Sequence, residues 1–190
     1  MEPGDGHDGW RHTPATAEGP VHATDLLVDA LGRIRDTVHE AVDGLDEEQL
    51  ATRIAPQANT IAWLVWHLSR VQDDHLAEAA GSVQVWTSDG WVERFRLGFG
   101  GSATGYGHSY AEVGRVRASA ELLSGYHDAV HARSSGWVRS LDTDALERVV
   151  DESWDPPVTL AVRLVSVIDD DIQHAGQAAF IRGILERGTP

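Results

Sequence analysis

Residues 61–80 read IAWLVWHLSRVQDDHLAEAA, and this stretch decides the fold. Its first half is apolar on nearly every side, which is typical of a helix buried among other elements. Pro56 breaks the chain before it, Asn59 or Thr60 can cap its first turn, and Gly81 follows its last residue. The pattern therefore predicts a long buried helix over residues 61–80.

Three more long helices are predicted around this one. In the segments of about 21–45 and 111–141, apolar residues recur at steps of three and four, as on one face of an amphipathic helix. A fourth helix is predicted from about residue 159 to about residue 187. We find no internal repeat and no alternating strand pattern of useful length. The sequence therefore predicts an all-α protein, an antiparallel four-helix bundle with short extra helical turns.

The segments outside the long helices differ in character. Residues 82–109 are rich in glycine and aromatic side chains and predict a long loop, a feature that is often a functional lid. Residues 151–158, DESWDPPV, form a connector with a double proline. Residues 1–20 show no periodicity and are predicted to be a flexible tail. One domain is expected over residues 21–188.

The composition narrows the classes of function. The chain has 190 residues, 42% of them apolar, which suits one globular domain with a buried core. Its formal net charge is −15, and a surface this acidic repels phosphate backbones and anionic lipid. No apolar run reaches the roughly 20 residues of a membrane helix. Neither nucleic-acid nor membrane binding is expected, and without a secretory signal we expect a cytoplasmic protein.

Two residue types are missing from the chain. It has no cysteine, so disulfides and thiolate ligands from the protein are excluded. All fifteen cationic residues are arginine, so the chain offers no lysine for a Schiff base or a phosphate-binding loop. No Gly-x-Ser-x-Gly nucleophile motif is present. The candidates for chemistry are therefore histidines and carboxylates.

The most informative stretch for function is DDDIQH, residues 169–174. Residues three and four apart share a helix face, so Asp170 and Asp171 can each aim a carboxylate at His174. A carboxylate and a neutral imidazole that converge in a helical core can bind a divalent metal. The alternative is an Asp–His hydrogen-bonded pair, or an exposed acidic turn with a buried histidine. Spacing alone does not choose between the two aspartates.

A second candidate ligand lies on the buried helix. His67 is inside WLVWHL, where a histidine is usually a hydrogen-bonded core residue. Together with residues 170–174 it would supply two imidazoles and a carboxylate, and three protein ligands with an open position are typical of catalytic zinc. The open position could lower the pKa of a bound water or of a substrate thiol. His127 and His131 also lie four apart, but nothing near them offers a third ligand.

Other residues are candidates for proton transfer or for substrate binding beside the metal. His75 follows His67 by eight residues, and His108 lies in the glycine-rich segment close to Tyr106. We regard His75, His108 and Tyr106 as candidates for proton transfer, and the alternative is that both histidines lie on the surface. Candidates for substrate binding are Trp63, Trp86, Trp91 and Phe95. The alternative for the aromatic residues of 82–109 is that they cap the end of the bundle.

These segments resemble the DinB/YfiT-like superfamily of four-helix bundles. The resemblance covers roughly residues 21–187 and rests on three features. One is NTIAWLVWHL at residues 59–68, and another is DIQHAGQ at residues 171–177 of the last helix, where Asp170-x-x-x-His174-Ala-Gly-Gln resembles the family's His-x-Gly-Gln signature. The third is the order and spacing of the four helices.

The resemblance implies a metal site. In the superfamily one ligand is a histidine of the second long helix, which here is His67, and two ligands four apart on the last helix match Asp170 and His174. The resemblance therefore selects Asp170, and not Asp171, as the carboxylate ligand. The first residue of that pair is usually His or Glu, and aspartate is one methylene shorter than glutamate, so a looser site or a different metal is implied. Zinc is the expected ion, with nickel, manganese or iron as alternatives.

The resemblance also implies an activity. Relatives include thiol S-transferases that use bacillithiol or mycothiol, and the metal domain of mycothiol-dependent maleylpyruvate isomerase. We therefore expect a metal-dependent transferase that takes a low-molecular-weight thiol such as mycothiol and an electrophilic small molecule. The alternatives are a hydrolase that uses a metal-activated water, and a non-catalytic small-molecule-binding or stress-response protein. A homodimer is a further alternative, because such bundles often pair through helix faces.

Overall fold

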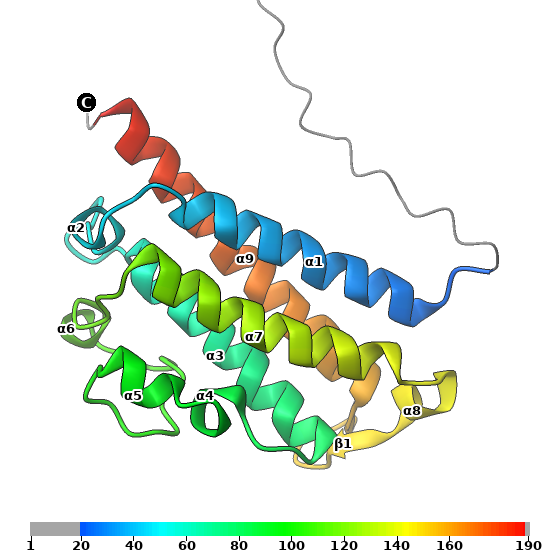
Figure 1. Ribbon diagram of the computed structural model, residues 1–190. Coiled ribbons are helices and arrows are strands. Elements are labelled where there is room, and N and C mark those ends of the chain that lie inside the picture. The colour runs from blue at the N-terminus through cyan, green and yellow to red at the C-terminus, as the bar shows by residue number, and fades with distance from the viewer. Residues whose placement is uncertain (1–19, 189–190) are drawn as a thin grey trace, which may run out of the picture.

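The computed structural model describes residues 20–188, and this part of the chain is mostly helical, as predicted. Four long helices dominate it (Figure 1). They are α1 (Ala23–Val42), α3 (Ile61–Ala80), α7 (Ala120–Arg139) and α9 (Leu160–Arg187). α3 packs against α7 and α9, and α1 packs against the same two helices from the other side. None of the described helices is long and apolar enough to cross a membrane.

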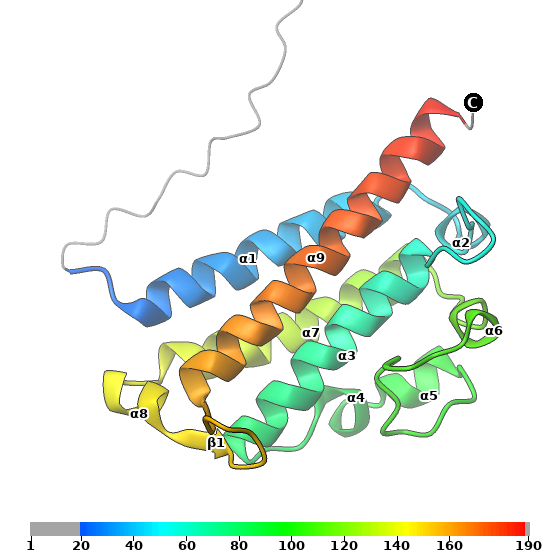
Figure 2. The ribbon, with the colours of Figure 1, turned by 180° about the vertical axis from the view of Figure 1, so that it is seen from behind.

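The directions of the long helices explain the layout of the chain. α1 and α9 run one way, whereas α3 and α7 run the other way (Figures 1 and 2). The predicted antiparallel arrangement therefore describes the neighbours α3–α9 and α1–α7, and it is wrong for the parallel neighbours α1–α9 and α3–α7. Because α7 follows α3 in sequence but runs parallel to it, the chain must first return along the length of α3, which requires a long crossover.

Residues 81–119 make this return. The segment predicted as one loop contains α4 (Val85–Ser88) and α5 (Trp91–Phe95), and α6 (Tyr110–Val113) follows. The third long helix therefore begins at Ala120 and not near residue 111. The physical reason is a cap: the Ser119 side chain accepts a hydrogen bond from the Leu122 backbone, which starts a new helix at that point.

Short elements complete the described part. α2 (Glu47–Leu50) and α8 (Thr143–Glu147) are the expected helical turns. β1 (Val149–Asp151) pairs antiparallel with β2 (Val158–Thr159), so the double-proline connector is a small ribbon, which the sequence did not predict. Strands of two or three residues are too short to show an alternating pattern. The predicted tail over residues 1–20 lies almost wholly outside the described residues.

α3 is the buried helix that its sequence predicts. Fifteen of its residues are buried, the Thr60 side chain caps its N-terminus, and Gly81 ends it in the left-handed conformation. Even Arg70 is fully buried on it. The Arg70 guanidinium donates to the Ala103 carbonyl at 3.0 Å and to the Gln84 side chain at 2.9 Å, so it ties the crossover to α3 at two places.

Candidate metal centre and its groove

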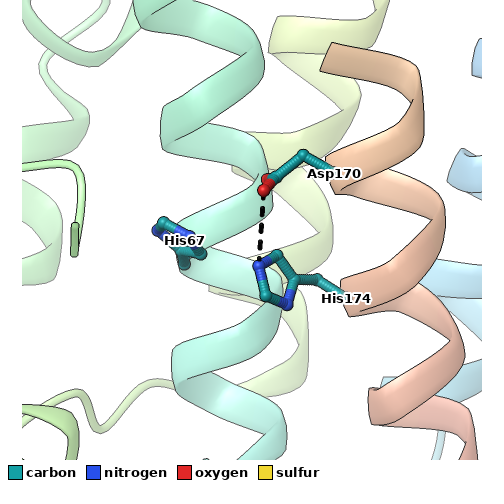
Figure 3. A group of neighbouring side chains, drawn as sticks. All are labelled: His67, Asp170 and His174. Atoms are coloured by element: carbon teal, nitrogen blue, oxygen red, sulfur yellow. Dashed lines mark ion pairs between the residues drawn. The ribbon is translucent and has the colours of Figure 1, made fainter. Parts of the chain in front are cut away.

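Three side chains from two antiparallel helices meet beside the packed core (Figure 3). His67 comes from α3, and Asp170 and His174 come from successive turns of α9. One ligand atom from each residue lies within 4.8 Å of the others. His174 Nε2 and Asp170 Oδ1 are 3.6 Å apart. Ligand atoms at these separations can share one ion, and three ligands leave a position open for a further group.

The proton on His67 is placed by a backbone carbonyl. His67 Nδ1 lies 2.6 Å from the Thr104 carbonyl oxygen. A carbonyl only accepts, so Nδ1 carries the proton and Nε2 keeps its lone pair for a ligand. Burial lowers the pKa of His67 and His174 adds to this effect, whereas Thr104 and Asp170 act in the opposite direction. The imidazole is therefore neutral at pH 7, as a metal ligand must be.

Gly105 allows this carbonyl to come so close. Its φ is +98°, and a Cβ there would lie 2.8 Å from His67 Nδ1 and 3.0 Å from the Trp66 ring. Only glycine fits a backbone that is both left-handed and pressed against a helix. The Trp63 ring stacks on the imidazole, with its centroid 4.5 Å from that of His67. The ring of His67 is therefore held on one face by an indole and at its Nδ1 edge by the backbone of Thr104.

The two candidate ligands on α9 also have defined orientations. His174 Nδ1 lies 3.2 Å from the Gln177 side-chain oxygen, so Nδ1 donates and Nε2 faces Asp170. Asp170 Oδ2 is buried and has no hydrogen-bond partner within residues 20–188. Burying a carboxylate oxygen without a hydrogen-bond donor costs free energy, and a bound cation would offset this cost. Two imidazoles and a carboxylate suit zinc, and also iron, manganese or nickel, so the residues fit a divalent ion.

Asp171, the other aspartate that spacing allowed, does not join this site. It is fully buried, and neither of its oxygens has a partner among the described residues. Burial raises the pKa of Asp171 well above its ordinary value, and the charge of Asp170 raises it further. Asp171 is therefore a protonated acid in the core, while Asp170 faces His67 and His174.

The competing histidine pair on α7 is not a metal site in the described part of the chain. His127 is fully buried, and its Nδ1 lies 3.0 Å from Ser69 Oγ. Burial lowers the pKa of His127 to about 3. His131 Nε2 instead lies 3.1 Å from Ser135 Oγ. Within residues 20–188 no third ligand residue joins this pair, as the sequence around it led us to expect.

A groove of about 640 Å³ opens beside the triad, and His67 and Asp170 form part of its wall. His75 and Tyr106, two predicted candidates for proton transfer, also line it, and Tyr106 is 92% exposed at its edge. His108 does not line the groove. Its Nδ1 accepts a hydrogen bond from Trp63 Nε1 at 3.3 Å, so it buttresses the indole that stacks on His67.

The aromatic residues proposed for substrate binding are mostly elsewhere. Trp63 lies beside the triad, but the other three pack around Tyr126 in the core, with ring centroids 5.1–5.8 Å from it. Those three are Trp86, Trp91 and Phe95. None of the three lines the groove, and their packing favours the alternative of a structural role over one in substrate binding. The crossover places them over α7, away from the groove.

Two residues of the groove were missed from the sequence. Trp154, 66% exposed in the β1–β2 connector, is one, and Arg163 of α9 is the other. Arg163 precedes Asp170 by seven residues, or two helical turns. This spacing puts both residues on the same face of α9, so the sequence could have identified Arg163. Trp154 gave no such signal, because the path of the connector is set by strand pairing.

One comparison with known proteins identifies a family. A family model described as mycothiol-S-transferase matches residues 26–187. Among solved structures, the chain is similar to one described as the conserved protein of a locus from Enterococcus faecalis. That protein is 32% identical over 86% of this chain and 96% of its own, with a TM-score of 0.80. No curated protein matches the chain.

Proposed function

Because this chain belongs to the mycothiol-S-transferase family, a DinB/YfiT-like family, we propose that it is a metal-dependent transferase that joins a mycothiol-type thiol to an electrophilic small molecule. In this proposal the four long helices form the four-helix bundle of that superfamily. The observation that carries it is the convergence of His67, Asp170 and His174 within 4.8 Å at the wall of the groove. Since the chain has no cysteine, the reacting sulfur must come from a co-substrate.

In this proposal the residues of the site have different roles. His67, Asp170 and His174 would hold the ion, for which zinc suits the ligand set best. When bound, the ion would supply the positive charge that keeps the thiol in its reactive thiolate form. The Thr104 carbonyl orients His67, and Trp63 covers its ring face. The groove beside the triad is the space for the electrophile.

The metal is tested first by elemental analysis of protein purified without an affinity tag. We expect about one divalent ion per chain, and its loss in His67→Ala and His174→Ala. His131→Ala is the matched control, because it removes a half-buried histidine of α7 that lies outside the triad. Metal content that is the same in the triad variants and in the control would refute the site.

Turnover is tested separately on metal-loaded protein, with mycothiol and a panel of electrophiles. We expect conjugation only when both thiol and metal are present, and its loss in the triad variants. Product formation without thiol would instead support hydrolysis by an activated water. Bound metal with no product from any electrophile would overturn the transferase and favour a binding protein.

A further inference from the structure

His75 is the feature of the groove that the triad does not explain. It lies on α3 eight residues after His67, which is about 12 Å of helix rise, and both residues line the groove. His75 Nδ1 lies 2.8 Å from Arg163 Nη1. A guanidinium can only donate, so Nδ1 must accept this bond, and the proton of the imidazole is on Nε2. The contact therefore fixes one tautomer of His75.

Arg163 is itself held in place. Its Nη2 donates to Asp151 Oδ2 at 3.1 Å, and its Nη1 lies 3.4 Å from Glu78 Oε2. The side chain of Arg163 is only 14% exposed and that of Asp151 25%, so the contact between them is largely shielded from water, whereas Glu78 is 72% exposed. His75 Nε2 makes no hydrogen bond to any of residues 20–188, and this atom is not fully buried. An oriented N–H donor therefore remains available to a ligand in the groove.

The charges around this donor select against anions. The acidic residues of the groove are Asp74, Glu78, Asp151 and Asp170, and its one arginine is Arg163. Arg163 already contacts two of those carboxylates and His75, so little of its charge is left for a ligand. A substrate that carries a carboxylate would be repelled here. A substrate that becomes negative only during the reaction would meet a donor aimed at the new charge, which is where catalysis gains most.

We propose that His75 Nε2 is the hydrogen-bond donor to the oxygen of the electrophile, and that the preferred electrophiles are uncharged conjugated carbonyls or epoxides. This inference rests on the proposed transferase function. His75 is then a catalytic residue and Arg163 a positioning residue. The span of two helical turns between His67 and His75 leaves room for an electrophile of several atoms between the thiol and the donor.

The reaction balances as an addition. The thiol gives its proton to water, and the thiolate sulfur then forms a bond to the β-carbon of the carbonyl compound, or to a ring carbon of the epoxide. The displaced electron pair, from the C=C bond or the ring C–O bond, moves to oxygen. His75 Nε2–H stabilises this oxygen by a hydrogen bond and keeps its own proton. Water finally supplies the proton that completes the thioether product.

The activity test compares two electrophiles on metal-loaded protein. In 2-cyclohexen-1-one the oxygen becomes negative as the S–C bond forms, whereas in iodoacetamide the negative charge leaves on iodide. We expect His75→Ala to lower the rate with the enone about 10- to 100-fold and to lower the rate with iodoacetamide much less, because no charge develops on an oxygen there. His131→Ala should change neither rate. Equal losses with both electrophiles, or no loss with the enone, would overturn the role of His75.

The tautomer test needs neither metal nor activity. Nitrogen-15 NMR of the metal-free protein should show His75 with its proton on Nε2. Arg163→Met should release this preference and lower the enone rate, and Arg163→Lys, which restores a donor, should recover part of both. A proton on Nδ1 of His75 in the unmodified protein would refute the inference. If that spectrum is as expected but neither electrophile is conjugated, the proposed function fails and not the geometry of His75.

Discussion

The histidines of this chain are fixed by very different neighbours. A carbonyl accepts from Nδ1 of His67, a guanidinium donates to Nδ1 of His75, and His127 is enclosed in the core beside Ser69. The first arrangement leaves a lone pair free at Nε2, and the second leaves a proton there. The same side chain is therefore prepared as a metal ligand at one position and as a hydrogen-bond donor at another.

The buried His127 should make the fold sensitive to acid. Its folded pKa is about 3, against 6.5 as its ordinary value. Between those values the unfolded chain binds a proton that the folded chain does not, so the free energy of unfolding falls as the pH falls from 6.5 towards 3. The expected contribution of His127 is a loss of about 1.4 kcal/mol per pH unit. The protonated Asp171 opposes it, because above the ordinary pKa of an aspartate the folded chain holds a proton that the unfolded chain does not. Urea unfolding of metal-free protein between pH 7 and pH 4.5 measures the net dependence.

His127→Leu should remove the contribution of His127, because the leucine cannot bind the proton. His131→Asn is the comparison: burial lowers the pKa of His131 as well, but this side chain is only half-buried, so its removal should change the slope less. The same slope in His127→Leu as in the unmodified protein would show that other groups cause the acid sensitivity.

At the scale of elements, the decisive one is the crossover between α3 and α7. Arg70 holds it at Gln84, near its start, and at Ala103, in its second half, and Asp73 accepts hydrogen bonds from two of its backbone amides, at 2.7 and 2.8 Å. This anchoring sets the position of Thr104, the next residue after Ala103, whose carbonyl orients His67. The crossover is thus a part of the candidate site and more than a connection.

Gly105→Ala tests this coupling. A Cβ at Gly105 would meet His67 Nδ1 at 2.8 Å, whereas at Gly107, which also has positive φ, it would meet nothing within 4 Å. Both substitutions carry the backbone strain of a left-handed alanine, of order 1–3 kcal/mol. Only Gly105→Ala should also weaken zinc binding, about 10- to 100-fold, as loss of a supporting contact does. Zinc titration of the two variants against a competing chelator compares them, and equal affinities would contradict the coupling.

The elements also show what could be predicted from the sequence. α3 was predictable because its apolar residues cover every side, and the ligand face of α9 because acidic residues and His174 recur at helical spacing. The direction of α7 was not predictable, since the choice between parallel and antiparallel packing is made by tertiary contacts. Tertiary contacts also decide the position of Trp86, which the sequence predicts as a substrate-binding residue and which is buried in the core. The hydrogen-bond partners of Arg163 could not be predicted, because one of them, Asp151, lies on the unpredicted strand β1.

At the scale of the whole molecule, the triad links two helices that hold the fold together. An ion bound by His67 of α3 and by Asp170 and His174 of α9 would bind the folded chain and not the unfolded one. Such binding stabilises by about 2.7 kcal/mol when the free ion is at one hundred times its Kd. We therefore expect zinc to raise the melting temperature of chelator-treated protein, measured by calorimetry.

Asp170→Asn should remove most of this response, because the amide lacks the negative charge of the carboxylate. Asp144→Asn, in the exposed α8, is the matched control and should respond as the unmodified protein does. An equal rise in melting temperature in Asp170→Asn would show that zinc stabilises the fold at another place.

The distance along the chain between the ligands has a consequence for biosynthesis. His67 precedes Asp170 and His174 by more than one hundred residues. During translation the first imidazole leaves the ribosome long before its two companions, and no part of the nascent polypeptide can complete the triad until α9 has emerged. On the proposed function, only a chain that has emerged beyond residue 174 can acquire the ion, and a product cut short before residue 170 would not bind it at this centre.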